Sequence, residues 1–261
     1  MKNRKIDHAM SNLLSRQDYL VTQANDLAKA FGSLTTFEHK VLDFCFSYVQ
    51  ASDDVNTVYQ VNSKDILRHL DLNQSGNNYH RVIKAFKGLN EKTAIYMLIH
   101  DEEGNKGILM TSLFDSIEIM NNGKTKFSFS RKIAPYVFQL KKNFYSFKLS
   151  ELGRIKSKYA LSLLKLWNAN SHGKLQNVHI NGSLDDWEAW LLGVDKNGIQ
   201  RKWPAGRFKQ QALIKAITEI EHLYPQKTFS LYTEMDGRKV VGYSLCINDN
   251  QNEVGNNGNA R

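Results

Sequence analysis

The chain contains very little cysteine and proline. Of its 261 residues, only two are cysteines and three are prolines. Cys45 and Cys246 lie about 200 residues apart, so neither a disulfide framework nor a clustered thiolate metal site is predicted, and both are expected to be small core residues. No apolar run approaches the roughly 20 residues of a membrane span, and residues 1–5 lack the apolar core of a signal peptide. These absences predict a cytoplasmic protein without a membrane partner.

Acidic residues are fewer than basic ones. The chain has 26 acidic and 35 basic side chains, a net charge of +9. The excess is clustered in two segments: one acid, Glu151, stands among six bases in 141–158, and 201–215 holds five bases and no acid. Clustered positive charge favours a polyanion through counterion release, and we expect nucleic acid. With 41% hydrophobic residues, a chain of this length can bury two modest cores, which predicts two domains.

The segment 204–224 has the periodicity of an amphipathic helix. Pro204 suits a first turn and Pro225 marks the stop. At about 100° per residue, the apolar arc is formed by Phe208, Ala212, Leu213, Ala216, Ile217, Ile220, Leu223 and Tyr224. The opposite face carries side chains that can donate to base edges and phosphates: Arg207, Gln211, Lys215, Thr218 and His222, with Gln210 and Ile214 on the flank. The alternative is an ordinary surface helix with solvated charges.

A hairpin follows this helix, and two helices precede it. Strands are predicted at 229–233 and 239–247 around the turn Asp236-Gly237, with Arg238 and Lys239 beside its tip. Upstream, 157–168 is a strongly apolar helix, and a capping-box spacing between Ser183 and Asp186 opens the next helix. Helix, helix, basic helix and hairpin is the order of a winged-helix module.

An earlier stretch repeats this order. Thr35 and Glu38 open a helix, a short strand follows at 58–61, and Ser63 caps a short helix. A longer helix then runs to about residue 90, and strands follow at 94–100, 108–120 and 124–130. In this longer helix, Tyr79, Val82, Ile83, Phe86 and Leu89 are expected to point inward, leaving His80, Arg81, Lys84 and Lys87 outward.

The repeated order predicts an α+β protein of two tandem winged-helix domains. The predicted divisions are a flexible N-terminus at 1–18, a first domain at 19–140, a second domain at 141–247 and a disordered tail at 248–261. The second domain is expected to be the main DNA-recognition unit.

Three motifs with possible chemistry are better explained by structure. Gly123-Lys124-Thr125 resembles the end of a phosphate-binding loop, but Glu118 occupies the place of the first required glycine. A rolling-circle nickase needs two histidines flanking one apolar residue, and none of the eight histidines forms such a pair. The acidic group Asp185, Asp186 and Glu188 falls in the first turns of a helix, where carboxylates oppose the helix dipole. We therefore predict no catalytic site, no metal and no cofactor.

Several stretches carry a family resemblance that covers roughly residues 10–247. They are Asn25-Asp26-Leu27, Leu34–Leu42, Phe147–Leu166 (FKLSELGRIKSKYALSLLKL), Arg207–Ile220 (RFKQQALIKAITEI) and Lys239–Ile247. Together they resemble the initiator proteins of theta-replicating plasmids, which bind directly repeated origin sequences called iterons.

The resemblance implies two winged-helix domains that embrace one iteron, each with a recognition helix in a major groove. By position, the second domain would contact DNA through Arg207, Lys209, Gln210, Gln211 and Lys215, with Arg238 and Lys239 on its wing. His80, Arg81, Lys84 and Lys87 would serve the first domain. The resemblance further implies a dimer that represses its own promoter, formed through the first domain, a monomer that opens the origin, and a host initiator and helicase as partners.

Two alternatives to this function remain open at the level of sequence. The first is a transcriptional regulator with tandem winged helices, which would share the DNA-binding face. The second is an origin-nicking rolling-circle enzyme, which would form a metal-dependent covalent adduct with DNA.

Overall fold

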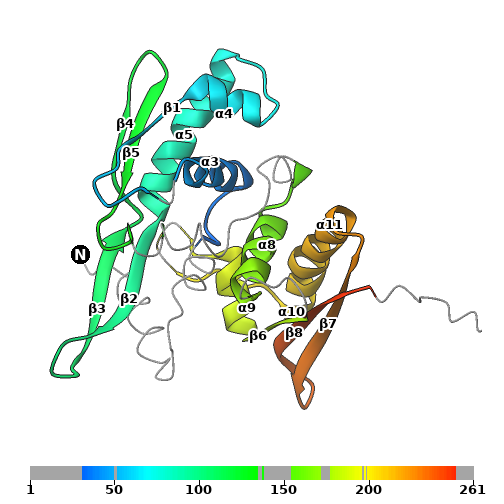
Figure 1. Cartoon of the computed structure of the whole chain (residues 1–261). Coiled ribbons are helices and arrows are strands. Elements are labelled where there is room, and N and C mark those ends of the chain that lie inside the picture. The colour runs from blue at the N-terminus through cyan, green and yellow to red at the C-terminus, as the bar shows by residue number, and fades with distance from the viewer. Residues whose placement is uncertain are drawn as a thin grey trace, which may run out of the picture.

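The computed structural model describes residues 31–49, 52–134, 137, 154–171, 177–195, 197 and 199–250. Three predicted features lie outside these residues: the segment 1–18, the domain boundary after residue 140, and the tail beyond residue 250. The described residues form two units, each with a separate hydrophobic core. Figure 1 shows the first unit in blue to green and the second in green to red.

The first unit combines three described helices with five strands. The helices are α3 (Thr36–Phe46), α4 (Ser63–His69) and α5 (Gly76–Lys92), and the strands are β1 (Tyr59–Asn62), β2 (Ala94–His100), β3 (Lys106–Ser112), β4 (Phe114–Ile119) and β5 (Lys124–Phe129). One antiparallel sheet has the order β1-β5-β4, and β2 and β3 form a separate hairpin. The unit is thus a winged helix with an additional hairpin inserted between its last helix and its wing.

The single strand predicted from 108 to 120 is in fact two strands. The break falls at Leu113, whose side chain is fully buried. Its N–H donates to Thr93 O and its carbonyl accepts from Ser130 N–H, so the chain changes partners there. The first half pairs with β2 and the second with β5.

The second unit contains the helices α8 (Lys158–Asn170), α9 (Leu184–Leu192), α10 (Ala205–Phe208) and α11 (Lys215–Leu223) and the strands β6 (Val178–Ser183), β7 (Lys227–Asp236) and β8 (Lys239–Asp249). A π-helical segment, η1 (Lys209–Ile214), joins α10 to α11, so 205–223 is one continuous helical element. The strand β8 extends through Asn248 and Asp249, two residues beyond the predicted strand.

The two units share one topology. In each, the strand after the first helix pairs with the last strand, which pairs with the other wing strand: β1-β5-β4 in the first unit and β6-β8-β7 in the second. The repeated order predicted from the sequence is therefore confirmed at the level of strand pairing.

Most local signals in the sequence are confirmed. Both capping boxes are present, Thr35 with Glu38 and Ser183 with Asp186. Ser63 is different: it is the first helical residue, and Asn62 supplies the capping side chain to Lys64 N–H. On α5, Ile83 is 42% exposed rather than buried, because the inward stripe passes through Val82, Ala85, Phe86 and Leu89.

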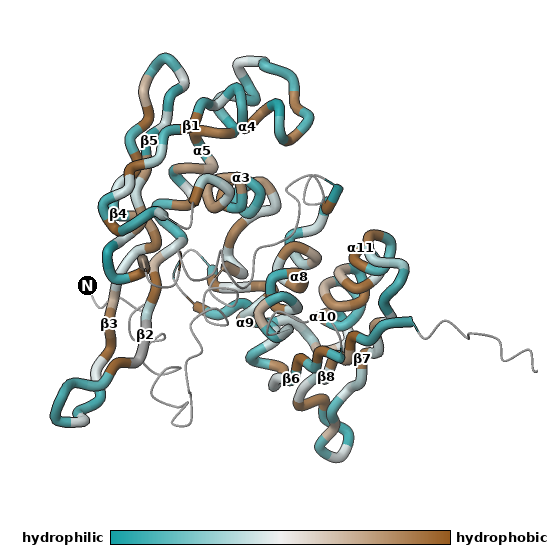
Figure 2. The backbone as a smooth tube through the Cα atoms, in the orientation of Figure 1, coloured by the Kyte–Doolittle hydropathy of each residue, from teal (hydrophilic) through white to brown (hydrophobic). Residues whose placement is uncertain are grey.

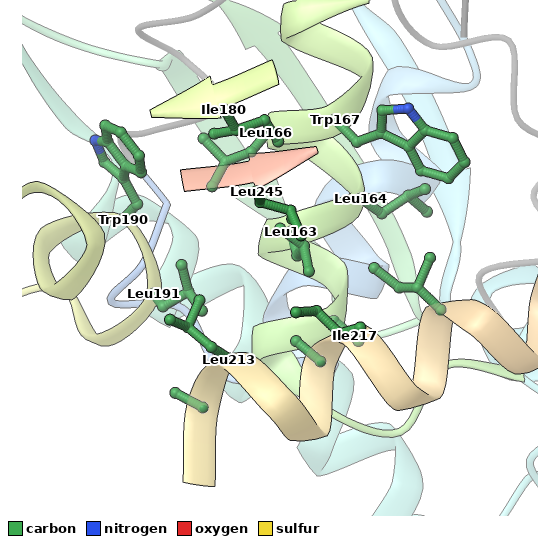
Figure 3. Packing of buried hydrophobic residues seen from close by; sticks show 14 of the residues in the cluster. Leu163, Leu164, Leu166, Trp167, Ile180, Trp190, Leu191, Leu213, Ile217 and Leu245 are labelled. Carbon is green, nitrogen blue, oxygen red and sulfur yellow. The ribbon is translucent and has the colours of Figure 1, made fainter. Parts of the chain in front are cut away.

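The second core is formed by α8, α9, the helical element 205–223 and the sheet. Figure 3 shows Leu163, Leu164, Leu166 and Trp167 of α8 between the sheet residues Ile180 and Leu245 and the helix residues Leu191, Leu213 and Ile217. The tips of the β2–β3 and β7–β8 hairpins are hydrophilic, as Figure 2 shows. Along β8, Tyr243, Leu245 and Ile247 face this core.

Cys246 alternates to the opposite side of the sheet. Its Sγ lies 3.1 Å from Nδ1 of His179, and the side chain is only partly buried. Because successive strand residues point to opposite faces, Cys246 cannot share the core with Leu245. The prediction that Cys246 is a core residue was therefore wrong, whereas Cys45 is fully buried as expected.

A buried charged cluster joins the two units. Nζ of Lys165, on α8, lies 2.7 Å from Oδ1 of Asp43, on α3, and 3.2 Å from Nδ1 of His39. The Lys165 and Asp43 side chains are 1% and 2% exposed. Burial lowers the pKa of His39 well below its usual value, and the nearby Lys165 adds to this effect. Burial also raises the pKa of Asp43, although the Lys165 ammonium opposes the shift.

Two glycines allow a close backbone contact between the units. A Cβ on Gly32 would lie 2.6 Å from the carbonyl oxygens of Ala189 and Trp190. Gly193 has φ +67°, and a Cβ there would lie 2.3 Å from Ser33 N. Hydrogen bonds close this contact: Lys158 Nζ donates to Gly32 O (2.9 Å), and Val194 N–H donates to Ser33 Oγ (2.9 Å). The contacts hold the two units in a defined relative orientation.

Candidate nucleic-acid interface

The helix at 205–223 presents one polar face to solvent. Phe208, Ala212, Leu213, Ala216, Ile217 and Ile220 are buried, as the periodicity predicted, while Leu223 and Tyr224 are only partly buried. The opposite face is exposed throughout: Arg207, Gln210, Gln211, Lys215, Thr218 and His222. The π-helical segment therefore does not disturb the separation of the two faces.

A buried carboxylate fixes the start of this helix. Glu188 on α9 is 1% exposed, and its Oε1 accepts from the backbone N–H of Trp203 (2.7 Å). Burial raises the pKa of the Glu188 carboxyl, and the hydrogen bond from Trp203 opposes the shift. Tyr243 of the wing contributes a second tie, because its hydroxyl donates to Ala205 O (3.0 Å). The helix thus begins at a position set by both α9 and β8.

Arg207 is held in place before any ligand binds. Its guanidinium carbon lies 4.3 Å from the ring centroid of Trp203, and its Nε donates to Gln211 Oε1 (3.2 Å). Trp203 in turn packs edge-on against Tyr159. Stacking and the hydrogen bond reduce the entropy that Arg207 would lose on binding a ligand. Sequence reasoning missed Trp203, although a tryptophan directly before the helix-initiating Pro204 was an available signal.

The other residues predicted in the second unit divide into two groups. Arg238 and Lys239 are exposed at the tip of the β7–β8 wing, beside Gly237 with φ +56°. Lys209 is only partly exposed, and its Nζ donates to Thr233 Oγ1 on β7 (2.9 Å). In this structure Lys209 therefore ties the helix to its wing.

In the first unit, the four predicted residues share the exposed face of α5. His80, Arg81, Lys84 and Lys87 are all exposed. The Arg81 guanidinium stacks over Phe37 at 4.5 Å and donates to Asn78 Oδ1 (3.1 Å), and Lys87 faces Glu91 at 3.7 Å. The Lys87–Glu91 pair is solvent-exposed and adds little stability.

The wing of the first unit carries two further cations that sequence reasoning did not select. Lys124 and Lys126 are exposed on β5, with the buried Thr125 between them. They lie opposite Asn62 and Gln60 of β1. The alternation of lysine with Thr125 and Phe127 was the available signal, since it places both cations on the outer face of a strand.

The motifs set aside in the sequence have structural roles. Gly123 has φ +82° in the turn between β4 and β5, and Lys124 and Thr125 are paired strand residues, so no phosphate-binding loop is formed. In the acidic group, Asp186 completes the capping box of α9 and Asp185 lies 2.7 Å from Lys202 Nζ. Over the described residues there is no group of three or more potential metal ligands, and no helix long and apolar enough to cross a membrane.

Solved structures of other proteins have a similar architecture. The Pi initiator protein, solved in complex with iteron DNA, aligns with a TM-score of 0.64 and 21% identity over 87% of this chain and 96% of its own. Domains 2 and 3 of RctB align with a TM-score of 0.52 and 12% identity, covering 83% of each chain. At these identities the likeness establishes the fold: two winged-helix units in tandem.

Comparison with curated proteins gave no significant match. Residues 20–168, more than half of the chain, match the sequence model of the initiator replication protein family, described as "Initiator Replication protein, WH1". The matched segment contains the whole described part of the first unit and continues into α8 of the second. The chain therefore belongs to the initiator replication protein family.

Proposed function

We propose that this protein is a plasmid replication initiator that binds repeated origin sequences in double-stranded DNA and starts theta-type replication. The observation that carries the proposal is the duplicated winged-helix topology, in which each unit presents an exposed basic helix and a wing. The buried contact between α3 and α8 holds the two units, and with them their exposed basic helices, in a defined relative orientation. Reading two segments of one repeat requires such a fixed orientation. The Pi initiator protein, which has this fold, was solved bound to iteron DNA, and this supports the choice of ligand.

Within this proposal the contacts divide by chemistry. Gln210 and Gln211 carry amide groups that can pair with an adenine edge, and Arg207 and Lys215 can reach guanine or phosphate. Arg238 and Lys239 on one wing, and Lys124 and Lys126 on the other, would contact backbone phosphates. The side chains on α5 would face a second segment of the DNA major groove: His80, Arg81, Lys84 and Lys87. Lys209 would act by fixing the wing against the helix rather than by touching DNA.

The test is a fluorescence-anisotropy titration of the full chain against a duplex carrying the direct repeats beside its gene, with a scrambled duplex as control, at two salt concentrations. A preference for the repeats of about a thousandfold that persists at the higher salt is the expected result. Equal, salt-sensitive binding to both duplexes would contradict specific recognition. Supplying the protein in trans to a plasmid that carries only the origin then separates an initiator, which sustains the plasmid, from a transcriptional regulator, which does not.

In this proposal the chain itself neither cleaves DNA nor hydrolyses nucleotide. Incubation with supercoiled origin DNA and Mg²⁺ or Mn²⁺, followed by denaturing electrophoresis, should leave no protein covalently attached to DNA. An adduct that depends on the metal would instead support an origin-nicking enzyme. Under the proposed function the monomer opens the origin and recruits a host initiator and helicase. The site of action would be the bacterial cytoplasm.

A dimer formed through the first unit belongs to the same proposal, as does repression of the protein's own promoter. The two-stranded β2–β3 sheet supports a dimer, because both of its strands have an unpaired edge among the described strands and it exposes Ile99 and Met110. Sedimentation-velocity runs over a range of protein concentrations should show exchange between monomer and dimer. Charged substitutions at Ile99 and Met110 should shift this equilibrium to the monomer.

A further inference from the structure

A groove runs beside the second half of the recognition helix. It has a volume of about 490 Å³ and lies between α11 and the chain that leads into α8. Its lining residues are Arg154, Lys156, Ile214, Lys215, Thr218, Glu219, His222 and Leu223. We propose that this groove is a binding site for one phosphodiester of the DNA backbone, next to the bases read by the helix.

The side walls of the groove are held together by one carboxylate. Both oxygens of Glu219, on α11, accept backbone hydrogen bonds, from Lys156 N–H and from Ser157 N–H (3.1 Å). Thr36 of the first unit secures the same segment, because its hydroxyl donates to Lys156 O (3.2 Å). These bonds involve only the backbone of Lys156, and its exposed side chain is among those that line the groove.

The charge of the groove favours an anion. Arg154, Lys156 and Lys215 contribute three positive charges, and all three side chains belong to exposed residues. The one acidic lining residue, Glu219, already accepts two backbone N–H groups. A phosphate entering here would meet cations from two separate chain segments, an arrangement that favours charge-assisted hydrogen bonds.

The position of the groove identifies which anion it would hold. Lys215 and Thr218 line the groove and also belong to the exposed face of the recognition helix, in line with Arg207 and Gln211. A helix lying in the major groove has a DNA backbone along each side, so the anion next to this face is a backbone phosphate. Ile214 and Leu223 supply apolar surface against which a deoxyribose can pack.

The inference rests on the proposed function for the choice of duplex, and a double variant tests it. R154A/K156A removes two exposed cations while keeping the backbone bonds to Glu219. Affinity should fall about tenfold or more on the repeat and scrambled duplexes alike, and the negative slope of log K against log salt should become shallower by about 0.9. The matched control is K106A/K132A, which removes the same charge from exposed positions at the β2–β3 hairpin and after β5 and should change affinity less than threefold.

A scan with methylphosphonate, which replaces one charged phosphate at a time by a neutral group, locates the contact. Neutralising one phosphate beside the helix should lower the DNA affinity of the wild-type protein and should not lower that of R154A/K156A any further. Unchanged affinity of the double variant, a loss confined to the repeat duplex, or the absence of any such position would each overturn the inference. If the wild-type protein shows no preference for repeats, the proposed function fails, while the salt slope on the scrambled duplex still tests the groove.

The substitution E219A separates positioning from charge. It makes the chain more positive, which by simple electrostatics should tighten DNA binding. If Glu219 holds Arg154 and Lys156 at the helix, binding should weaken instead, by about tenfold. Tighter binding would show that the carboxylate does not position the groove. Thermal unfolding of each variant establishes that the loss is not a failure to fold.

Discussion

The buried pair between Asp43 and Lys165 provides the sharpest test of how the two units are joined. Substituting Lys165 by methionine keeps an unbranched side chain that is one heavy atom shorter and removes the charge. Asp43, whose side chain is 2% exposed, would then be left as a buried carboxylate without its counterion. Breaking a buried pair in this way costs about 3–5 kcal/mol of unfolding free energy. Because burial already raises the pKa of Asp43, the cost of K165M should decrease toward acidic pH, where the carboxyl takes up a proton.

The structure offers a matched control at the same distance. Lys202 and Asp185 also lie 2.7 Å apart, but their side chains are 57% and 66% exposed. The corresponding substitution K202M should cost no more than about 1 kcal/mol, since water screens an exposed pair. The double variant D43L/K165M, which replaces both charges by apolar groups, should recover most of the lost stability.

Urea denaturation followed by two signals measures both the stability and the coupling of the units. All four tryptophans, Trp167, Trp187, Trp190 and Trp203, belong to the second unit, so their emission follows that unit alone. Far-UV circular dichroism follows both units. The two curves should coincide in the wild-type protein and separate in K165M. A loss below about 1 kcal/mol in K165M, or no difference from K202M, would refute the reasoning that a dry charged contact joins the units.

Three further predictions follow from the same structure. The pKa of His39 is lowered when the chain is folded, so below about pH 6.5 the unfolded chain binds a proton that the folded chain does not. In that range the unfolding free energy should fall by up to about 1.4 kcal/mol for each unit that the pH is lowered. The H39Q variant should lose this pH dependence. G193A should cost more than about 1 kcal/mol in urea denaturation, because φ is +67° and the added Cβ would meet Ser33; a neutral effect would contradict the close contact. Q211A should cost about 1–3 kcal/mol on the repeat duplex only if Gln211 reads a base, whereas an equal loss on a scrambled duplex would assign it to the backbone.

Much of the fold and the exposed face of the helix at 205–223 were predictable because local signals and periodicity are properties of neighbouring residues. The capping boxes at Thr35 and Ser183, the turns at Gly123 and Gly237 and the outward face of 205–223 all depend on spacings of a few residues. The predictions that failed depend on partners distant in sequence. Leu113 splits the strand predicted at 108–120 because Thr93 and Ser130 bind its backbone. Cys246 lies outside the core, and its Sγ is 3.1 Å from Nδ1 of His179 on the neighbouring strand.

The sequence by itself determined that this chain has two similar modules, each with an amphipathic basic helix and a hairpin, because repeated periodicity and turn chemistry are written locally. Only the tertiary structure decided how the modules meet. The burial of Lys165 against Asp43 and His39 depends on α3 and α8 packing together across more than 100 residues of chain. The groove beside α11 likewise has walls from two distant segments, and Glu219 accepts a hydrogen bond from the backbone of Lys156, 63 residues away. The charge composition predicted a polyanion partner, but folding decides that Arg154, Lys156 and Lys215 line the same groove.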